Sequence, residues 1–332
     1  MKPPSKLYRY RPLSDALLER ELGALQDSFL FSPSFSDMND PMEAFYETGS
    51  SADPMLDALL ARSGKNTGEM YEMLSETLEK FGLVSFASSY QALPLWAYYG
   101  SNFGGMCLEF DAEELTVSDF KGESFRRVTY ARTPLPPLTI ADLTPNKAEE
   151  EAIRRLTRKR IEWAHEGEWR YVTGCVGRKH YLDDALQRVF LGPRVNAVHA
   201  ERICEVLDRR PVEVLQGVVD GFELTFRTIK PARPFEGCDR VGAGKFDPAE
   251  DLRLDDLQEF LSVPVSALFE ECHRTALRPN MEGFAGIDLS RDLKSALYIW
   301  TTYKLRNGNI VWHQRFFDRR FRPVHGPVRS TQ

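Results

Sequence analysis

The sequence predicts an α+β protein, in which a mixed, mainly antiparallel sheet flanked by helices is followed by a mostly helical C-terminal region. Short apolar and aromatic runs at residues 6–11, 83–89 and 106–111 are typical of strands, and other segments carry apolar residues at helical spacing. The Pro/Gly-rich stretch KPARPFEG then separates two compositional regions. We therefore expect a core domain over residues 1–230 and a C-terminal extension over residues 231–332.

The N-terminal elements follow from local patterns. KLYRYR predicts a strand over residues 6–11, because it is short, aromatic and partly alternating. Ser14 and Asp15 are suited to begin a helix, and leucines at helical spacing carry it to about Leu25. A second strand is expected near residues 28–32. A strand, a helix and another strand thus begin the chain.

The middle of the chain combines helical patterns with strands. Residues 52–80 carry amphipathic patterns that predict a helical insert, whereas residues 133–145 hold four prolines and must form a surface connection. A helix is expected over residues 147–164, with acidic residues in its first turn, where the helix dipole favours them. Residues 168–176 predict a strand, and residues 221–229 predict the last strand of the core domain.

The C-terminal region differs in composition. Residues 247–261 and 266–277 predict helices, and residues 293–305 fit either a helix or a strand. Residues 309–317 form an aromatic, strand-like run. The last residues, 318–332, are basic and interrupted by prolines, so they predict a tail.

Composition limits the classes of function. The formal net charge of −6 and the pI near 5.7 give no global basic field, so any contact with nucleic acid must be local. Five widely spaced cysteines without a CxxC pair suggest reduced thiols in a cytoplasm. No stretch approaches the ~18 apolar residues that a membrane span needs, and the N-terminus lacks an apolar signal region. We expect a cytoplasmic protein without membrane contact.

Two carboxylates stand one residue apart in the segment WAHEGEWRYV. If this segment is extended, Glu166, Glu168 and Arg170 share one face, because side chains alternate along a strand. One interpretation is a set of ion pairs with Arg170 or with Arg160 of the preceding helix. The other is a carboxylate held beside an aromatic core, where it polarises a hydroxyl or stabilises a developing cation.

The first predicted strand repeats this pattern with arginines. Arg9 and Arg11 fall on one face of LYRYR, and Tyr8 and Tyr10 fall on the other. Charges on an edge strand discourage aggregation, which is one explanation. The alternative is an anion site, because arginine forks grip phosphate or diphosphate through two hydrogen bonds.

Two further segments offer groups for a ligand. WAYYG carries Trp96 and Tyr99, which belong either to the core or to a surface that stacks on a planar ring. Asn39 and Asp40 either cap their own turn or hydrogen-bond a ribose beside a cleft. The six histidines show no metal-binding spacing, and no P-loop, GxGxxG or GxSxG motif occurs.

Several segments occur together in a recognisable order: LYRYR, FSPSFSDMNDPMEAF, VSFASSYQALPLWAYYGSNFGGMCLEFD, the segment from Lys159 to Arg170 with the pattern K-x-x-x-W-x-x-E-x-EWR, and FLGPRV. With these, residues 6–230 resemble a bacterial family known as domain of unknown function 2971. The resemblance implies a cytoplasmic protein of the kind associated with mobile elements and antiphage defence.

A second resemblance concerns chemistry. Mono-ADP-ribosyltransferases of the arginine–serine–glutamate kind carry an arginine on the first strand, a serine on the second and Glu-x-Glu on a later one. This chain has Arg9 or Arg11 in LYRYR, Ser85 or Ser88 in VSFASS, and then Glu166-Gly167-Glu168. The order of the elements matches, although the family's Ser-Thr-Ser sequence is absent.

This resemblance implies an NAD-using enzyme of the kind that acts as a bacterial toxin or antiphage-defence effector. Glu168 would stabilise the oxocarbenium character that develops on the ribose, and Glu166 would orient or deprotonate the acceptor. An arginine of the first strand would hold the diphosphate, and Tyr99 or Trp96 would stack on nicotinamide. NAD is then a co-substrate, and the acceptor is an unknown macromolecule, either protein or nucleic acid.

Two other classes of function stay open. In a metal-dependent nuclease, Glu109 or Asp111 would join Glu166 and Glu168 around Mg²⁺, with Lys179 nearby. In a non-catalytic sensor or adaptor, the acids would form ion pairs only, and the C-terminal region would bind a partner protein. For an enzyme, we expect the cleft where LYRYR, the Asn-Asp-Pro loop, WAYYG and EGEWR converge.

Overall fold

The structure is a computed structural model that describes residues 2–34, 37–38, 42, 76, 79–136, 145–251, 254–293 and 295–324. Within these ranges the fold is α+β with mainly antiparallel sheets, as the sequence predicts. Asn39, Asp40 and nearly all of the expected helical insert lie outside the described residues, as does the end of the predicted tail from residue 325 on.

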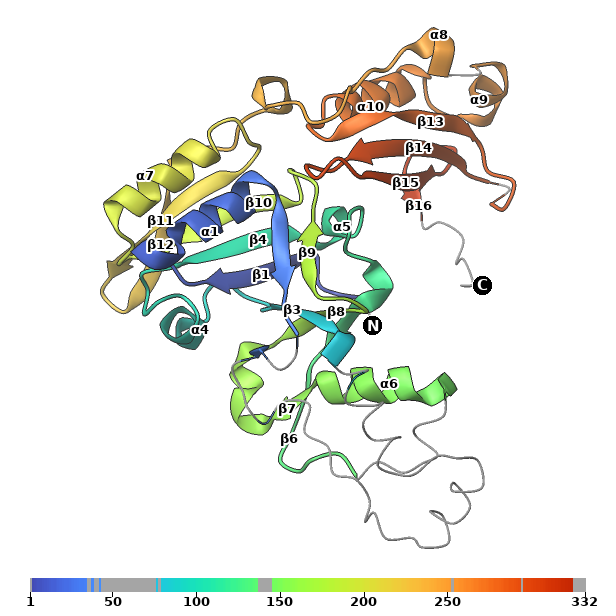
Figure 1. Ribbon diagram of the computed structural model, residues 1–332. Coiled ribbons are helices and arrows are strands. Elements are labelled where there is room, and N and C mark those ends of the chain that lie inside the picture. Colours follow the sequence, from blue (N-terminus) through green and yellow to red (C-terminus); the bar gives the residue numbers. More distant parts are fainter. Residues whose placement is uncertain are drawn as a thin grey trace, which may run out of the picture.

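A five-stranded sheet forms the centre of the core region (Figure 1). Its strands, in spatial order, are β1 (Lys6–Arg11), β4 (Met106–Asp111), β10 (Leu186–Leu191), β11 (Glu213–Asp220) and β12 (Glu223–Lys230). Only β10 and β11 run parallel, and the other neighbours are antiparallel. Strand β1 therefore lies at one edge of this sheet.

Two helices cover one face of the sheet, α1 (Asp15–Gln26) and α7 (Ala197–Val206) (Figure 1). Leu18 and Leu22 of α1 pack with Leu7 and Leu108 in the main hydrophobic core, because the leucines recur at helical spacing. The opposite face carries a second, aromatic cluster that includes Trp96 of the short helix α4 (Leu93–Tyr98). Strand β1 thus contributes alternate residues to two layers.

A smaller sheet adjoins the edge strand β1. It has the order β3 (Gly82–Phe86), β8 (Trp169–Thr173) and β5 (Phe125–Arg127). The two sheets meet where Tyr8 forms an isolated bridge with Ala87, so β1 and β3 diverge from a shared contact. Two further pairs extend this side of the molecule: antiparallel β2 (Phe29–Ser32) with β9 (Gly177–His180), and parallel β6 (Thr129–Ala131) with β7 (Arg158–Arg160).

The helix expected over residues 147–164 is shorter than predicted. Helix α6 spans Pro145–Leu156, and the chain then enters β7 and a six-residue 3-10 helix, η4 (Ile161–Glu166). Thr157 follows α6 and turns its hydroxyl back onto the carbonyl of Ile153 at 2.8 Å, a local bond that competes with helix continuation. The remaining short helices of the core are α5 (Ala112–Leu115) and η2 (Gly122–Ser124).

The prediction of a mostly helical C-terminal region is wrong. After η5 (Phe235–Gly237), the helices α8 (Pro248–Asp251), α9 (Leu254–Phe260) and α10 (Ser266–Ala276) are followed by four antiparallel strands, β13 (Met281–Leu289), β14 (Leu297–Lys304), β15 (Ile310–Phe317) and β16 (Pro323–Val324). Buried and more exposed residues alternate along β14, as expected for a strand. The sequence of this segment fits either a helix or a strand, because its many aromatic residues do not distinguish the two. Two glycines in β13 interrupt the pattern of apolar residues from which a strand would be predicted.

The C-terminal region contacts the core region through the apolar Met281, Tyr303 and Leu305, which belong to the main hydrophobic core, and through charged side chains. Arg278 donates to Asp184 at 2.6 Å and also to Glu114 of α5. Arg306 binds Asp183, whose carboxylate is fully buried. The division at residue 230 stays a prediction. In the described part of the chain, none of the helices combines the length and the apolar character that crossing a membrane requires.

Candidate functional site

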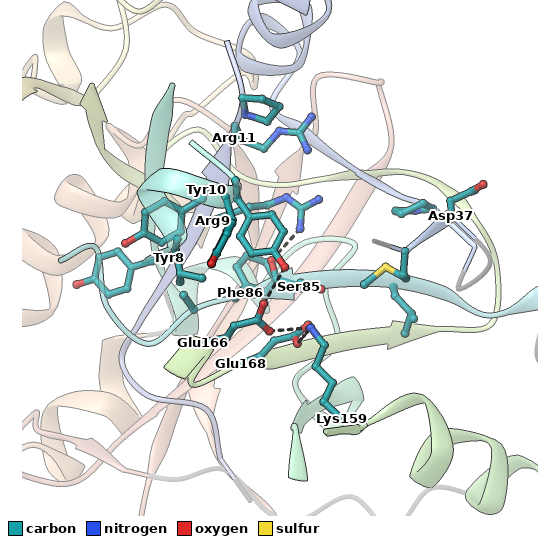
Figure 2. Close-up of a pocket in the computed structure, with 18 of the residues that line it drawn as sticks. Tyr8, Arg9, Tyr10, Arg11, Asp37, Ser85, Phe86, Lys159, Glu166 and Glu168 are labelled. Atoms are coloured by element: carbon teal, nitrogen blue, oxygen red, sulfur yellow. Dashed lines mark hydrogen bonds and ion pairs between the residues drawn. The ribbon is translucent and has the colours of Figure 1, made fainter. Parts of the chain in front are cut away.

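A cavity of about 550 Å³ opens between β1, β3 and the segment from η4 to β8 (Figure 2). Strand β1 supplies Tyr8, Arg9, Tyr10 and Arg11, and β3 supplies Ser85. The other lining residues are Pro12, Arg20, Pro33, Asp37, Met38, Leu83, Phe86, Ala87, Leu95, Tyr98, Tyr99, Lys159, Glu166 and Glu168. Three of the four segments that the sequence predicts at the cleft therefore line one cavity, and the fourth lies outside the described residues.

Lys159 joins the two glutamates. Its Nζ lies 2.7 Å from Glu166 Oε2 and 2.9 Å from Glu168 Oε2. Arg170 donates to both oxygens of Glu168, from Nε at 2.7 Å and from Nη2 at 3.1 Å. Tyr99 donates its hydroxyl to Glu166 Oε1 at 2.7 Å. All four charged side chains are almost fully buried, so the two acids and two bases form a neutral group inside the protein.

Glu166 reaches this group by a turn and not by strand alternation. It is the last residue of η4, and β8 begins only at Trp169, so the expected extended face does not include Glu166. Gly167 has a left-handed φ of 54°, and a Cβ there would lie 2.6 Å from the Ser88 hydroxyl. Glycine therefore permits the reversal that brings the carboxylate of Glu166 beside that of Glu168.

The two carboxyls differ in pKa. Burial alone would raise the pKa of Glu168, but Arg170 and Lys159 outweigh it and lower the pKa to about 2. Burial raises the pKa of Glu166 above its ordinary value despite the contact with Lys159. Glu168 is therefore a fixed anion at neutral pH, whereas Glu166 is the carboxyl better suited to exchange a proton.

The other end of the cavity is cationic (Figure 2). Arg11 and Arg20 share one buried carboxylate, that of Glu21, with Arg11 Nε at 2.8 Å from Oε2 and Arg20 Nη2 at 2.8 Å from Oε1. Arg9 donates Nη1 to the carbonyl of Ser85 at 2.8 Å, and its buried Nε has no hydrogen-bond partner. Among the described residues Arg9 makes no ion pair, and burial lowers its pKa because it disfavours the charged form. A bound anion would offset this cost by pairing with the guanidinium group.

The aromatic residues divide between the core and the cavity. Trp96 is fully buried, donates its indole N–H to the carbonyl of Tyr90 at 2.8 Å and does not line the cavity. Tyr10 packs edge-on against it with ring centroids 5.2 Å apart. Tyr98 and Tyr99 line the cavity, and Tyr98 is 69 % exposed. A planar ligand would therefore stack on these tyrosines and not on Trp96.

Sequence reasoning did not single out Lys159 or Arg20. Lys159 stands seven residues before Glu166 in the pattern that carries the family resemblance, so this pattern could have indicated Lys159 as a site residue. The apolar spacing of residues 147–164 predicts a continuous helix. The structure instead has the short strand β7 there, and from this strand Lys159 reaches the cavity. Arg160, considered as a partner of the two site glutamates, instead pairs with the exposed Glu162 at 2.9 Å.

The carboxylates considered for a nuclease lie apart from this group. Glu109 contacts Lys6 at 3.9 Å, and Asp111 accepts from Lys6 at 3.3 Å and from the N-terminus of α5. Lys179 donates to Cys175 at 3.0 Å. Over the described ranges, no group of three or more histidine, cysteine, aspartate or glutamate side chains is arranged to hold a metal ion.

Comparison with known families gave one match. Residues 95–171 match the family model described as "Protein of unknown function (DUF2971)". This match supports the resemblance to that family, and it covers the segment from α4 to the acids and β8. Neither the curated proteins nor the solved structures yielded a match.

Proposed function

We propose that the protein is an ADP-ribosyltransferase-like enzyme that uses NAD as co-substrate. One observation carries the proposal: a single cavity combines an arginine that forms no ion pair within the described part of the chain with a buried pair of glutamates. NAD has a diphosphate that requires cations and a ribose whose cleavage develops positive charge. The two ends of the cavity match these two requirements.

The charges suggest how NAD would lie. The diphosphate takes the end with Arg9, Arg11 and Arg20, where three guanidinium groups face one buried carboxylate, that of Glu21. The nicotinamide ribose then reaches the two glutamates. Tyr99, whose hydroxyl donates to Glu166, would flank the nicotinamide ring. A volume of about 550 Å³ falls within the range of small-molecule sites, roughly 300–1,000 Å³.

The two glutamates take different roles in this reaction. Glu168 stays ionised and fixed by Arg170, so its charge stabilises the oxocarbenium character at the ribose carbon without moving. Glu166 accepts the proton from the acceptor group as that group attacks. The bond from the acceptor to the ribose carbon forms, the bond to nicotinamide breaks, and neutral nicotinamide leaves while the acceptor's proton passes to Glu166 and then to solvent.

Nicotinamide release from NAD tests the proposal. The wild-type protein, Glu166→Gln, Glu168→Gln and Arg9→Gln are incubated with NAD and cell extract as the source of acceptor, and nicotinamide is measured by chromatography. We expect Glu166→Gln to lower the rate by about 10²-fold or more. Glu223→Gln is the matched control, because Glu223 is an exposed residue of β12 with no role at the cavity.

Three results would oppose the proposal. A wild-type rate no higher than that of Glu166→Gln or Glu168→Gln removes it. Cleavage of DNA or RNA that depends on a divalent cation would favour the nuclease alternative. Cellular activity that survives neutralisation of both glutamates would favour an adaptor. A role as a toxin or antiphage effector remains part of the proposal, and comparing bacterial growth on expression of the wild type and of Glu166→Gln tests it.

A further inference from the structure

A second cavity, of about 270 Å³, lies beside the paired strands β6 and β7 and the end of α6, which are close together in Figure 1. Lys159 lines this cavity as well as the first one, so the two cavities are neighbours across one side chain. Its described lining residues are Met42, Ala131, Arg132, Thr133, Pro134, Leu135, Arg155, Arg158, Lys159 and Arg160.

All charged residues in that described lining are cations. Two of them have guanidinium nitrogens that the described chain leaves unsatisfied. Arg155 is 2 % exposed, and although its Nε lies 2.8 Å from Glu151, its Nη1 has no hydrogen-bond partner. Arg158 binds the carbonyl of Thr133 through Nη2 at 2.9 Å, but its buried Nε has no partner. Buried donors without a partner are rare in folded proteins, so protein, ordered water or a ligand is expected to satisfy them.

Apart from Thr133, the rest of the described lining is apolar. Ala131, Pro134 and Leu135 form a wall next to the arginines, and Met42 adds a thioether. A cavity with cations at its margin and an apolar wall fits a nucleotide, whose planar base packs on apolar groups or on a guanidinium plane while its phosphates bind the cations. An acidic peptide also offers anions, but it has no planar group between successive charges. The chemistry of the lining therefore favours a nucleotide unit over a run of carboxylates.

We propose that this cavity binds single-stranded nucleic acid, which is then the acceptor of ADP-ribose. The inference rests on the proposed function and deepens it, because it names the class of acceptor. One unstacked base would occupy the apolar wall, and the flanking phosphates would bind Arg132, Arg155 and Arg158. The strand would then continue past Lys159 toward Glu166. The negative net charge of the chain is no obstacle, since the cations are concentrated locally.

Fluorescence anisotropy without NAD tests the binding. The probes are labelled single-stranded oligonucleotides of thymidine or uridine, about ten nucleotides long. The variants are Arg132→Gln, Arg158→Gln and the double variant, because neither arginine has a carboxylate partner among the described residues. Arg227→Gln on β12 is the matched control for loss of one exposed positive charge. Melting temperatures establish that each variant is folded, and the exposed Arg132 keeps the test valid if the Arg158 variant unfolds.

The inference predicts a specific result. The double variant should bind about tenfold more weakly, and the slope of log affinity against log salt should decrease by about 1.4, because about 0.7 is lost for each phosphate contact to a single strand. Arg227→Gln should bind as the wild type does. Wild-type affinity in the double variant, or no wild-type binding at about 50 mM salt, would overturn the inference.

Competition identifies the ligand. Unlabelled oligonucleotide should displace the probe at far lower concentration than inorganic phosphate, a mononucleotide or polyglutamate. Equal competition by phosphate or a mononucleotide would show a small-anion site, and stronger competition by polyglutamate would show a site for acidic protein, so either result overturns the inference. Because these measurements omit NAD, intact binding with no nicotinamide release would refute only the proposed function. If the oligonucleotide stimulates nicotinamide release from NAD equally in the wild type and in the double variant, only the acceptor site would be refuted.

Discussion

Replacing Lys159 by methionine removes a cation that touches both glutamates of the first cavity. At 2.7 and 2.9 Å, each pair gains roughly 6 kcal/mol of Coulomb attraction at an effective dielectric constant near 20. Much of this gain is offset by the cost of removing the charges from water. Arg170 still holds Glu168 in the variant, so the loss falls on Glu166, whose remaining side-chain partner among the described residues is Tyr99. We expect the free energy of unfolding to fall by about 3–5 kcal/mol.

The loss should depend on pH in a defined direction. Burial already raises the pKa of Glu166 in the folded protein, and loss of Lys159 should raise it further. A carboxyl with a raised folded pKa favours folding fully below its unfolded pKa, and that contribution is lost as pH rises through the folded value. The deficit of Lys159→Met should therefore be larger at pH values above neutrality than near the ordinary glutamate pKa.

Urea unfolding of four proteins measures this effect: wild type, Lys159→Met, Glu166→Gln and the double variant. The neutral amide removes the uncompensated charge, so the double variant should be more stable than Lys159→Met alone. Two results would contradict this account of the site. One is a loss below about 1 kcal/mol in Lys159→Met, which is the size of a surface ion pair. The other is a double variant less stable than Lys159→Met.

Three further predictions follow from particular contacts. Glu168→Gln should make the free energy of unfolding less dependent on pH in acid. The folded pKa of Glu168 is lowered from 4.5 to about 2, so the wild type should lose about 3 kcal/mol of stability as pH falls through that range, whereas the variant should not. Unfolding followed at several acidic pH values decides this, and parallel curves would contradict it. Tyr99→Phe should cost about 1 kcal/mol and raise the pKa of Glu166, because the phenol donates to that carboxylate. The pKa can be followed by carboxyl NMR, and an unchanged or lower value would count against the contact. Arg278→Met should cost about 3–5 kcal/mol, because two acids of the core region lose their cation. Chemical unfolding measures the cost, with Arg227→Met as the control, and equal stability of these two variants would show that the contact does not support the C-terminal sheet.

The sequence was sufficient where one periodic pattern ran through an element. In β1, the expected alternation of side chains is observed, because Arg11 binds Glu21 of α1 while Tyr10 packs on the other face, in the aromatic cluster that holds Trp96. The mainly antiparallel character of the sheets was predicted from similar short apolar runs, whereas the spatial order of the strands was not predicted. Such runs are informative because each has one buried face that fixes its register.

The sequence was insufficient where one residue redirects the chain. The face shared by Glu166 and Glu168 was predicted from alternation, but the left-handed conformation of Gly167 produces their contact. The inward position of Lys159 depends on the end of α6 at Leu156, which helical periodicity does not mark. In the C-terminal region, glycines in β13 weakened the apolar pattern on which strand prediction rests.

Isothermal titration of NAD into the purified protein tests the central claim most directly, because it requires neither an acceptor nor turnover. We predict binding of one NAD per chain by the wild type and by Arg227→Gln. In Arg9→Gln the heat of binding should be lost or the affinity reduced by at least about tenfold, since a charge-assisted hydrogen bond contributes about 1.5–3 kcal/mol. Binding of equal affinity in Arg9→Gln, or no binding to the wild type, would contradict the assignment of this cavity to NAD.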